Sequence, residues 1–116
     1  IRFIDDDGTE VAGLSRVNRT ETAVERTRGL LGRAVLHGNE ALWIDPCGSI
    51  HTFGMKYPID VIYLDSQLVV RKISNKVVPM RMSFCFSARS TLELAASNAA
   101  RLGLMAGHRV EWLSND

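Results

Sequence analysis

The sequence predicts a mainly β, α+β fold: a small antiparallel barrel or sandwich of about seven short strands, with two short helices at its edge. Two features of the sequence predict this fold. The apolar runs are short and are separated by turn residues such as Gly, Asp and Pro. They also do not alternate regularly with helical patterns, which argues against a parallel sheet built from βαβ units. With 116 residues and 46% hydrophobic content, the chain is expected to form one domain over residues 1–116.

The first predicted element is a β-hairpin. Residues 2–4 and 9–11 are its arms, and Asp7-Gly8 supplies a turn that needs positive φ. The acidic run 5–7 also invites a calcium loop, which needs a glutamate at about the twelfth position. That position holds Arg16, so the turn interpretation is favoured.

The first helix is predicted from Thr22 to about Leu31. Thr22 and Glu25 form a capping box, and Gly32 is placed to end the helix in a left-handed conformation. Arginines leave the helix on its polar sides, and we expect one of them to form an ion pair with Asp60 or Asp65 or else to be solvated. These arginines are Arg26, Arg28 and Arg33.

The middle and the end of the chain predict further strands. The run Ile59–Leu64 is apolar on both alternating faces, which is typical of a central strand buried on both sides. The segment Ser74–Met82 is polar and contains a proline, and it is predicted to be a surface loop. The other strands are predicted over Glu40–Ile44, Leu68–Ile73, Ala88–Leu94 and Arg109–Leu113.

A second short helix is predicted between the last two strands. Ser97 is its expected N-cap, the helix covers Asn98–Leu102, and Gly103 is placed to stop it.

Charge and composition restrict the partners. A net charge of +1 argues against a nucleic-acid binder, and no apolar run is long enough to span a membrane. The cations are 11 arginines and 3 lysines, a bias that suits an anionic ligand or else reflects a GC-rich genome. We expect a monomer without a cofactor.

The two cysteines, Cys47 and Cys85, are expected to be unpaired, because a core of this size needs no disulfide. Unpaired thiols slightly favour the cytoplasm. Because the chain begins at Ile1 rather than at methionine, a preceding signal peptide and export stay open.

Four stretches carry a resemblance to a known family: Glu25–Arg33, Pro58–Asp65, Ala88–Leu94 and Arg101–Val110. In their order and composition they resemble the domain of unknown function 192 family, over roughly Thr9 to Val110. The resemblance implies a β-rich fold, often in exported or membrane-linked bacterial and archaeal proteins, and no established activity. The chain departs from the family's commoner Phe-Trp-Met-Lys-Asn-Thr form at residues 50–55, which read Ile-His-Thr-Phe-Gly-Met.

The candidate site is the irregular loop Ile50–Lys56 before the central strand. Unmatched polar groups gather at this end of the strand, so we expect an accessory module that binds a small anionic or sugar-like ligand, or a protein partner. Aromatic residues Trp43, Phe53, Tyr57 and Trp112 would line the pocket or simply belong to the core. The expected binding residues are Arg26, His51, Thr52, Phe53, Met55, Lys56 and Asp60.

Two alternative functions stay open, and two kinds of chemistry have little support in the sequence. His51 and Asp60 could form the acid–base pair of a small enzyme, or the polar residues could only hold the fold. A zinc site would rest on a single Cys47-x₃-His51 pair, and no signature surrounds either cysteine as a nucleophile, so neither a metal nor covalent catalysis is predicted.

Overall fold

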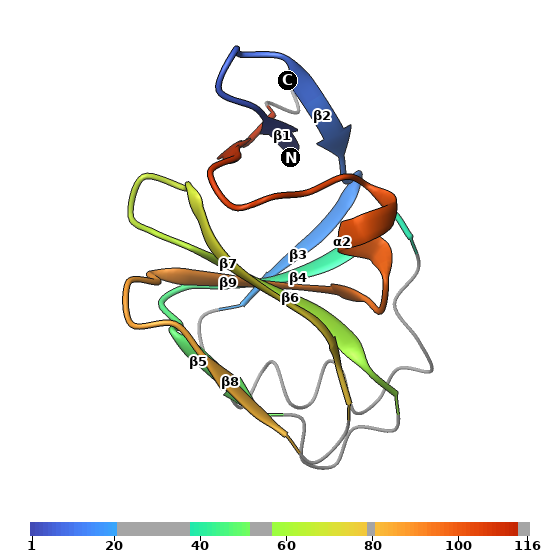
Figure 1. The fold of residues 1–116 in the computed structure, drawn as a ribbon, viewed down its shortest axis with the longest axis vertical. Helices are drawn as coiled ribbons and strands as arrows, with labels where there is room; N and C mark the ends of the chain where they lie inside the picture. Colours follow the sequence, from blue (N-terminus) through green and yellow to red (C-terminus); the bar gives the residue numbers. More distant parts are fainter. Residues whose placement is uncertain (21–37, 52–56, 79–80, 114–116) are drawn as a thin grey trace.

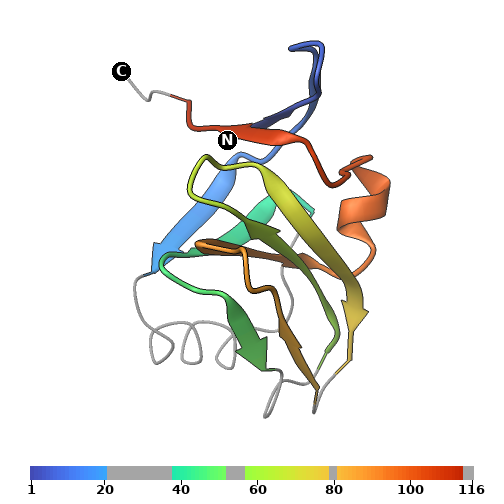
Figure 2. The same cartoon turned by 60° about the vertical axis from the view of Figure 1, so that its left-hand side comes forward.

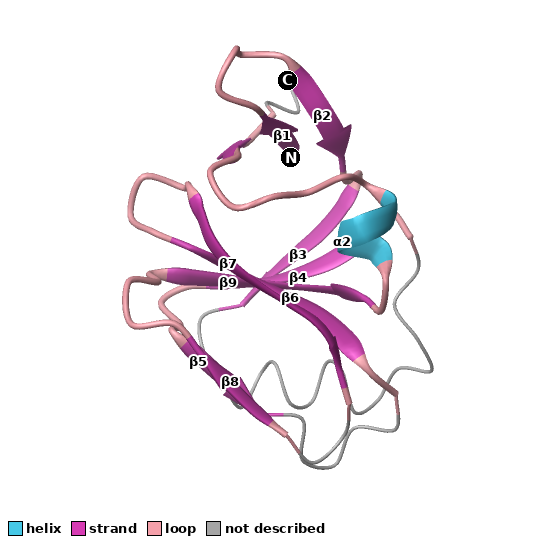
Figure 3. Cartoon of the chain, viewed as in Figure 1, coloured by secondary structure: helices cyan, strands magenta, loops and turns pink. Residues whose placement is uncertain are grey.

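The structure, a computed structural model, describes residues 1–20, 38–51, 57–78 and 81–113. Within these ranges, ten short strands and one short helix form the fold (Figures 1 and 3). The elements are β1 (Arg2–Ile4), β2 (Glu10–Gly13), β3 (Arg16–Thr20), β4 (Glu40–Ile44), β5 (Ser49–His51), β6 (Ile59–Leu64), β7 (Val70–Val77), β8 (Met82–Phe84), β9 (Ser90–Ala95), α2 (Asn98–Arg101) and β10 (Arg109–Glu111).

A five-stranded sheet crosses the middle of the molecule, with the strand order β3-β4-β9-β6-β7 (Figure 1). The strands β3 and β4 are parallel, and the other neighbours are antiparallel. All six residues of β6 are buried. This confirms the central strand that the sequence predicts as buried on both faces. The strands β7 and β9 pair with its two edges, and apolar clusters cover its two faces.

A three-stranded sheet with the order β10-β1-β2 covers one end of the molecule. The strands β1 and β2 form the predicted hairpin, with Gly8 at φ +80 in its turn. The Asp5 carboxylate accepts hydrogen bonds from the amides of Asp7 and Thr9, at 2.9 Å and 3.0 Å. Asp5 therefore stabilises the turn, as the sequence predicts.

The main core lies between these two sheets. Phe3 of β1 and Val110 of β10 pack against Trp43, Ile62 and Leu92 of the large sheet. The opposite face of β6 forms a second cluster from Ile59, Val61 and Tyr63, with both cysteines packed against it. The strand β6 therefore contributes apolar side chains to both faces of the sheet.

The third sheet has two strands, β5 and β8, and lies at the other end of the molecule (Figures 1 and 2). Their antiparallel register places Ser49 opposite Phe84 and His51 opposite Met82. A hydrogen bond of 2.9 Å between the Ser74 and Ser83 hydroxyls joins β8 to β7 of the large sheet.

The helix α2 begins where the sequence predicts, but by a different means. Ser97 has a φ of 70 and its side chain makes no capping hydrogen bond. The capping acceptor is instead the Asp60 carboxylate, which accepts from the backbone amides of Ser97 and Ala99 at 3.1 Å and 2.8 Å. Gly103, at φ +73, follows the helix and ends it as predicted.

Other parts of the sequence prediction need correction. The described strands form open sheets rather than a closed barrel. Of the two predicted helices, the described part of the chain contains the second, α2. The predicted loop Ser74–Met82 is wrong at both ends, because Ser74–Val77 continues β7 and Met82 begins β8. Three strands, β3, β5 and β8, were not predicted at all. The predicted first helix and its arginines lie outside the described residues.

Asp65 forms an ion pair within the β6–β7 hairpin. It binds the guanidinium of Arg71 at 2.7 Å, and the predicted ion pair with an arginine of the first helix lies outside the described residues. Partial burial works to raise the pKa of Asp65, but the amides of Val69 and Gln67, together with Arg71, lower it below its usual range.

None of the helices described is long and apolar enough to cross a membrane.

Candidate binding site

Of the residues predicted for the site, Asp60 is the one whose side chain the structure places. Arg26, Thr52, Phe53, Met55 and Lys56 lie outside the described residues, and His51 is placed through its backbone, in β5. The predictions for these positions stand as predictions.

Asp60 is fully buried at the start of β6. Besides the two amides of the α2 N-terminus, its carboxylate accepts the Lys76 amide of β7 at 2.9 Å. These three hydrogen bonds join β6, which carries Asp60, to β7 and to α2. Such hydrogen bonds satisfy backbone groups that would otherwise be buried without a partner, so the arrangement is that of a structural anchor.

The predicted aromatic pocket is not assembled. Trp43 is buried and packs edge-to-face against Trp112, with ring centroids 5.0 Å apart. Trp43 belongs to the main core, whereas Tyr57 packs on the other face of the large sheet, against the cluster around Tyr63. The large sheet thus separates these aromatic residues.

The described surface has a different candidate site, centred on β8. This strand has an inverted polarity: Ser83 points inward and is 9% exposed, whereas Met82 and Phe84 are 72% and 52% exposed. Phe86, in the turn after the strand, is 96% exposed. Large apolar side chains gathered on a surface usually mark a binding site.

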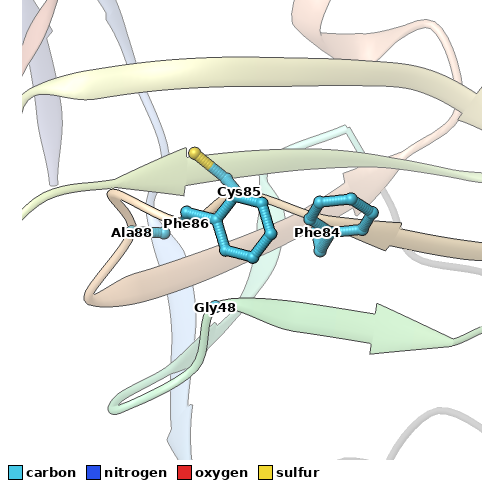
Figure 4. A pocket seen from close by; sticks show the side chains of 5 residues that line it. All are labelled: Gly48, Phe84, Cys85, Phe86 and Ala88. Atoms are coloured by element: carbon cyan, nitrogen blue, oxygen red, sulfur yellow. The ribbon is translucent and has the colours of Figure 1, made fainter.

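An apolar hollow of about 530 Å³ lies beside this strand, between β8 and the start of β5. Figure 4 shows the Phe84 and Phe86 rings next to each other, and their centroids are 5.0 Å apart. The Cys85 sulfur points away from Gly48 (Figure 4), towards the buried cluster of β6. The lining residues are Gly48, Phe84, Cys85, Phe86 and Ala88.

Gly48 lies at the floor of this hollow and is hydrogen-bonded to the residue that follows β8. Its carbonyl accepts the Cys85 amide at 2.9 Å. A Cβ atom at this position would lie 3.4 Å from the Cys85 carbonyl oxygen and 3.6 Å from that of Ala88. A larger side chain would therefore enter the floor of the hollow.

A second hollow, of about 370 Å³, lies on the other side of Phe84, between β7 and β8. Its described lining contains serines, apolar residues and three basic residues, but no acidic residue. The basic residues are Lys72 and Lys76 of β7, and Arg81. The Lys72 ammonium donates to the Phe84 carbonyl at 2.8 Å and lies 5.4 Å from the Phe84 ring centroid. Phe84 is therefore the wall between an apolar hollow and a cationic hollow.

Tyr63 lies under this region, on the face of β6 that carries the second cluster. The pKa of Tyr63 is raised to about 12, chiefly by burial and to a lesser extent by nearby Cys47, Cys85 and Glu93, against the lowering effect of Ser83. Its hydroxyl has no hydrogen-bond partner with good geometry among the described residues. Tyr63 therefore stays neutral at physiological pH.

The described side chains do not assemble a metal site. Within the described ranges, no three His, Cys, Asp or Glu side chains lie close enough together to hold an ion. Cys47 and Cys85 form no disulfide with each other and are both half-buried, as predicted.

The sequence did contain a signal for this site. Met82, Phe84 and Phe86 recur at every second position, and so do Lys72, Ser74 and Lys76 on the neighbouring strand. Period-two patterns predict strands with one uniform face. The predicted loop Ser74–Met82 interrupts both patterns, because it includes Met82 of the first and Ser74 and Lys76 of the second.

Comparisons with known proteins agree with the fold. A family model described as "Uncharacterized ACR", domain of unknown function 192, matches residues 3–112. None of the curated proteins compared with the chain matches it.

Two solved structures share the architecture. One, a Sinorhizobium meliloti 1021 protein provisionally described as a transcription regulator, is 23% identical, with a TM-score of 0.82 over 95% of this chain and 89% of that chain. The other, a protein of unknown function from Novosphingobium aromaticivorans DSM 12444, is 24% identical, with a TM-score of 0.81 over 96% of this chain and 82% of that chain. At these identities the likeness shows the fold and no function.

Proposed function

We propose that this chain, which belongs to the domain of unknown function 192 family, is an accessory module that binds anionic ligands carrying an apolar group. The observation that carries the proposal is the inverted polarity of β8, where Phe84 separates an apolar hollow from a cationic one. A ligand of this kind would place its apolar group against Phe84 and Phe86 and its anionic group near Lys72.

The charges of the cationic hollow support the anionic part. The Lys72 ammonium carries three N–H donors, and the Phe84 carbonyl takes one of them. Neither Lys72 nor Lys76 forms an ion pair with a carboxylate of the described residues. Both can therefore bind an anion without first breaking an internal ion pair.

The site predicted from the sequence, the loop Ile50–Lys56, overlaps β5. Its first two residues, Ile50 and His51, belong to this strand rather than to a loop, and His51 is opposite Met82 of β8. We propose that this loop and β8 contribute to one site. The loop residues and Arg26 keep the binding roles predicted for them.

The acid–base alternative has less support. A general base must reach the proton that it removes, but Asp60 is fully buried and accepts three backbone amides. A purely structural role for the chain would leave the nearly complete exposure of Phe86 without a reason.

The test is an NMR titration of isotope-labelled protein with three related compounds. Phenylbutyrate carries both groups, phenylbutanol only the ring and butyrate only the charge. We expect amide shifts at Phe84, Phe86 and Lys72 with phenylbutyrate, and at least about tenfold weaker binding of the other two, because each lacks one half of the recognised chemistry.

Variants at the proposed site and matched control variants test whether phenylbutyrate binds there. Phe84→Ser should weaken phenylbutyrate binding about tenfold, and Lys72→Gln about two- to fivefold, the range for a partly exposed ion pair. Met105→Ser removes an equally exposed apolar side chain, and Arg16→Gln removes an exposed cation from the opposite edge strand, so neither should weaken binding. Equal binding of all three compounds, or equal losses in the control variants, would show that the proposed site is wrong.

A further inference from the structure

The spacing of the cations in the hollow between β7 and β8 restricts the size of the ligand. Lys72 and Lys76 lie four positions apart on one strand, so their Cα atoms are at most about 13 Å apart, the span of a fully extended chain. The left-handed backbone of Lys76, at φ 50, and a register shift in the pairing with β6 make this distance shorter. The hydrogen bond to the Phe84 carbonyl holds the Lys72 ammonium at one end of the hollow. The two cations therefore project from separate backbone positions, and a ligand with two anionic groups matches them better than a ligand with one.

The shape of the site restricts the ligand further. The cationic hollow follows β7, and the apolar hollow continues from it beyond Phe84. The two hollows are concave and share one wall, so they suit side chains that project from an extended backbone. Alternate side chains of an extended peptide point in opposite directions, about 7 Å apart on each side.

From this geometry we propose that the physiological occupant is an extended acidic segment of a partner protein. An apolar side chain of this segment occupies the hollow beside Phe86, and carboxylates further along the same face of the segment bind Lys72 and Lys76. This inference rests on the proposed function and specifies its ligand. Charge complementarity supports it, because the described lining of the cationic hollow contains three basic residues and no acidic one.

An anionic membrane surface fits the site less well. A membrane-inserting tip places its apolar side chains outermost, with its cations at the level of the headgroups. Here the Lys72 ammonium is turned back onto the protein, over the Phe84 and Tyr63 rings at 5.4 Å and 5.9 Å from their centroids. The Phe84 and Phe86 rings also line a hollow rather than forming a continuous ridge.

The experiment uses the peptide Phe-Ser-Glu-Ser-Glu-Ser-Glu with blocked ends, in which the phenylalanine and the glutamates share one face of the extended chain. Binding is followed by NMR shifts and isothermal titration calorimetry of the same protein. Two control peptides carry glutamine for every glutamate, or serine for the phenylalanine. We expect the parent peptide to shift the amides of Lys72, Lys76, Phe84 and Phe86, and each control to bind at least about fivefold more weakly. Raising the salt from about 20 mM to 300 mM should weaken the parent peptide severalfold, because the charges are exposed to solvent.

Variants of the protein separate this proposal from a small-ligand site. Lys76→Gln should weaken the acidic peptide two- to fivefold and leave phenylbutyrate, with its single charge, unchanged. Arg16→Gln is the matched control and should affect neither.

The possible failures are distinguishable. If phenylbutyrate binds but the acidic peptide does not, or binds no better than its glutamine control, the peptide proposal is wrong and the proposed function stands. If neither compound binds, the proposed function is wrong as well. Vesicles of phosphatidylglycerol form a third arm, and vesicle binding that is lost in Phe86→Ser without any peptide binding would identify a lipid surface instead and overturn the proposal.

Discussion

The two small sheets at the ends of the molecule are built from strands of similar length with opposite polarity. In the three-stranded sheet, Phe3 and Val110 point inward and are buried, and charged side chains such as Arg2 and Glu111 pair on the outside at 2.8 Å. In the two-stranded sheet, Ser83 points inward and Met82 and Phe84 point outward. The first sheet closes the core, whereas the second exposes apolar surface at a cost in hydration free energy. The difference fits the proposal that one end of the molecule contributes stability and the other contributes binding.

The largest expected effect tests this comparison directly. Phe3→Ala should lower the free energy of unfolding by about 3–5 kcal/mol, because it leaves a cavity in the main core. Phe84→Ala should lower it by less than about 1 kcal/mol, because the ring is half exposed. Urea denaturation of the two variants measures both values. Equal losses would contradict the assignment of different roles to the two sheets.

A second prediction concerns the anchor that holds α2. Asp60→Ala removes an acceptor of three buried amides and should cost about 3 kcal/mol of unfolding free energy. Asp60→Asn keeps one oxygen acceptor and should cost less. Thermal and urea denaturation give the stability, and the titration with phenylbutyrate gives the binding. If Asp60 is only an anchor, the folded Asn variant will bind phenylbutyrate as the unchanged protein does; a selective loss of binding would return Asp60 to the site, as the sequence predicts.

These roles show how much of the structure the sequence could predict. The first hairpin, the buried strand β6 and the positions of β4, β9 and α2 follow from turn residues and apolar runs, which are local signals. The Ser97 cap was a reasonable prediction from residue type, but the actual acceptor, Asp60, is 37 positions away in the sequence. Local patterns carry no information about a contact of this range.

The candidate site was harder to predict for a different reason. Hydrophobic patterns assume that the apolar face of a strand is the buried one, and β8 reverses this assumption. The strand β3 was missed because its residues are mostly polar, and its pairing with β4 is parallel, across a long connection. The predicted loop begins in β5, which pairs with β8, so the site predicted from the sequence and the proposed site both involve this small sheet.

The smallest change in stability at neutral pH is expected for a substitution of Tyr63, which lies beneath the proposed binding surface. Because the Tyr63 hydroxyl has no well-placed hydrogen-bond partner among the described residues, Tyr63→Phe should change the stability at pH 7 by less than about 1 kcal/mol. The two proteins should diverge in alkali. The pKa of about 12 in the folded chain lies above the usual value near 10, so the unfolded chain loses the proton first. The native state therefore keeps its full stability below about pH 10 and loses up to about 3 kcal/mol as the pH rises to 12. Denaturation at pH 7, 10 and 11 should show this loss in the unchanged protein and a smaller one in Tyr63→Phe. Equal losses would mean that Tyr63 ionises normally, and that the surface formed by β5 and β8 leaves the layer beneath it open to water.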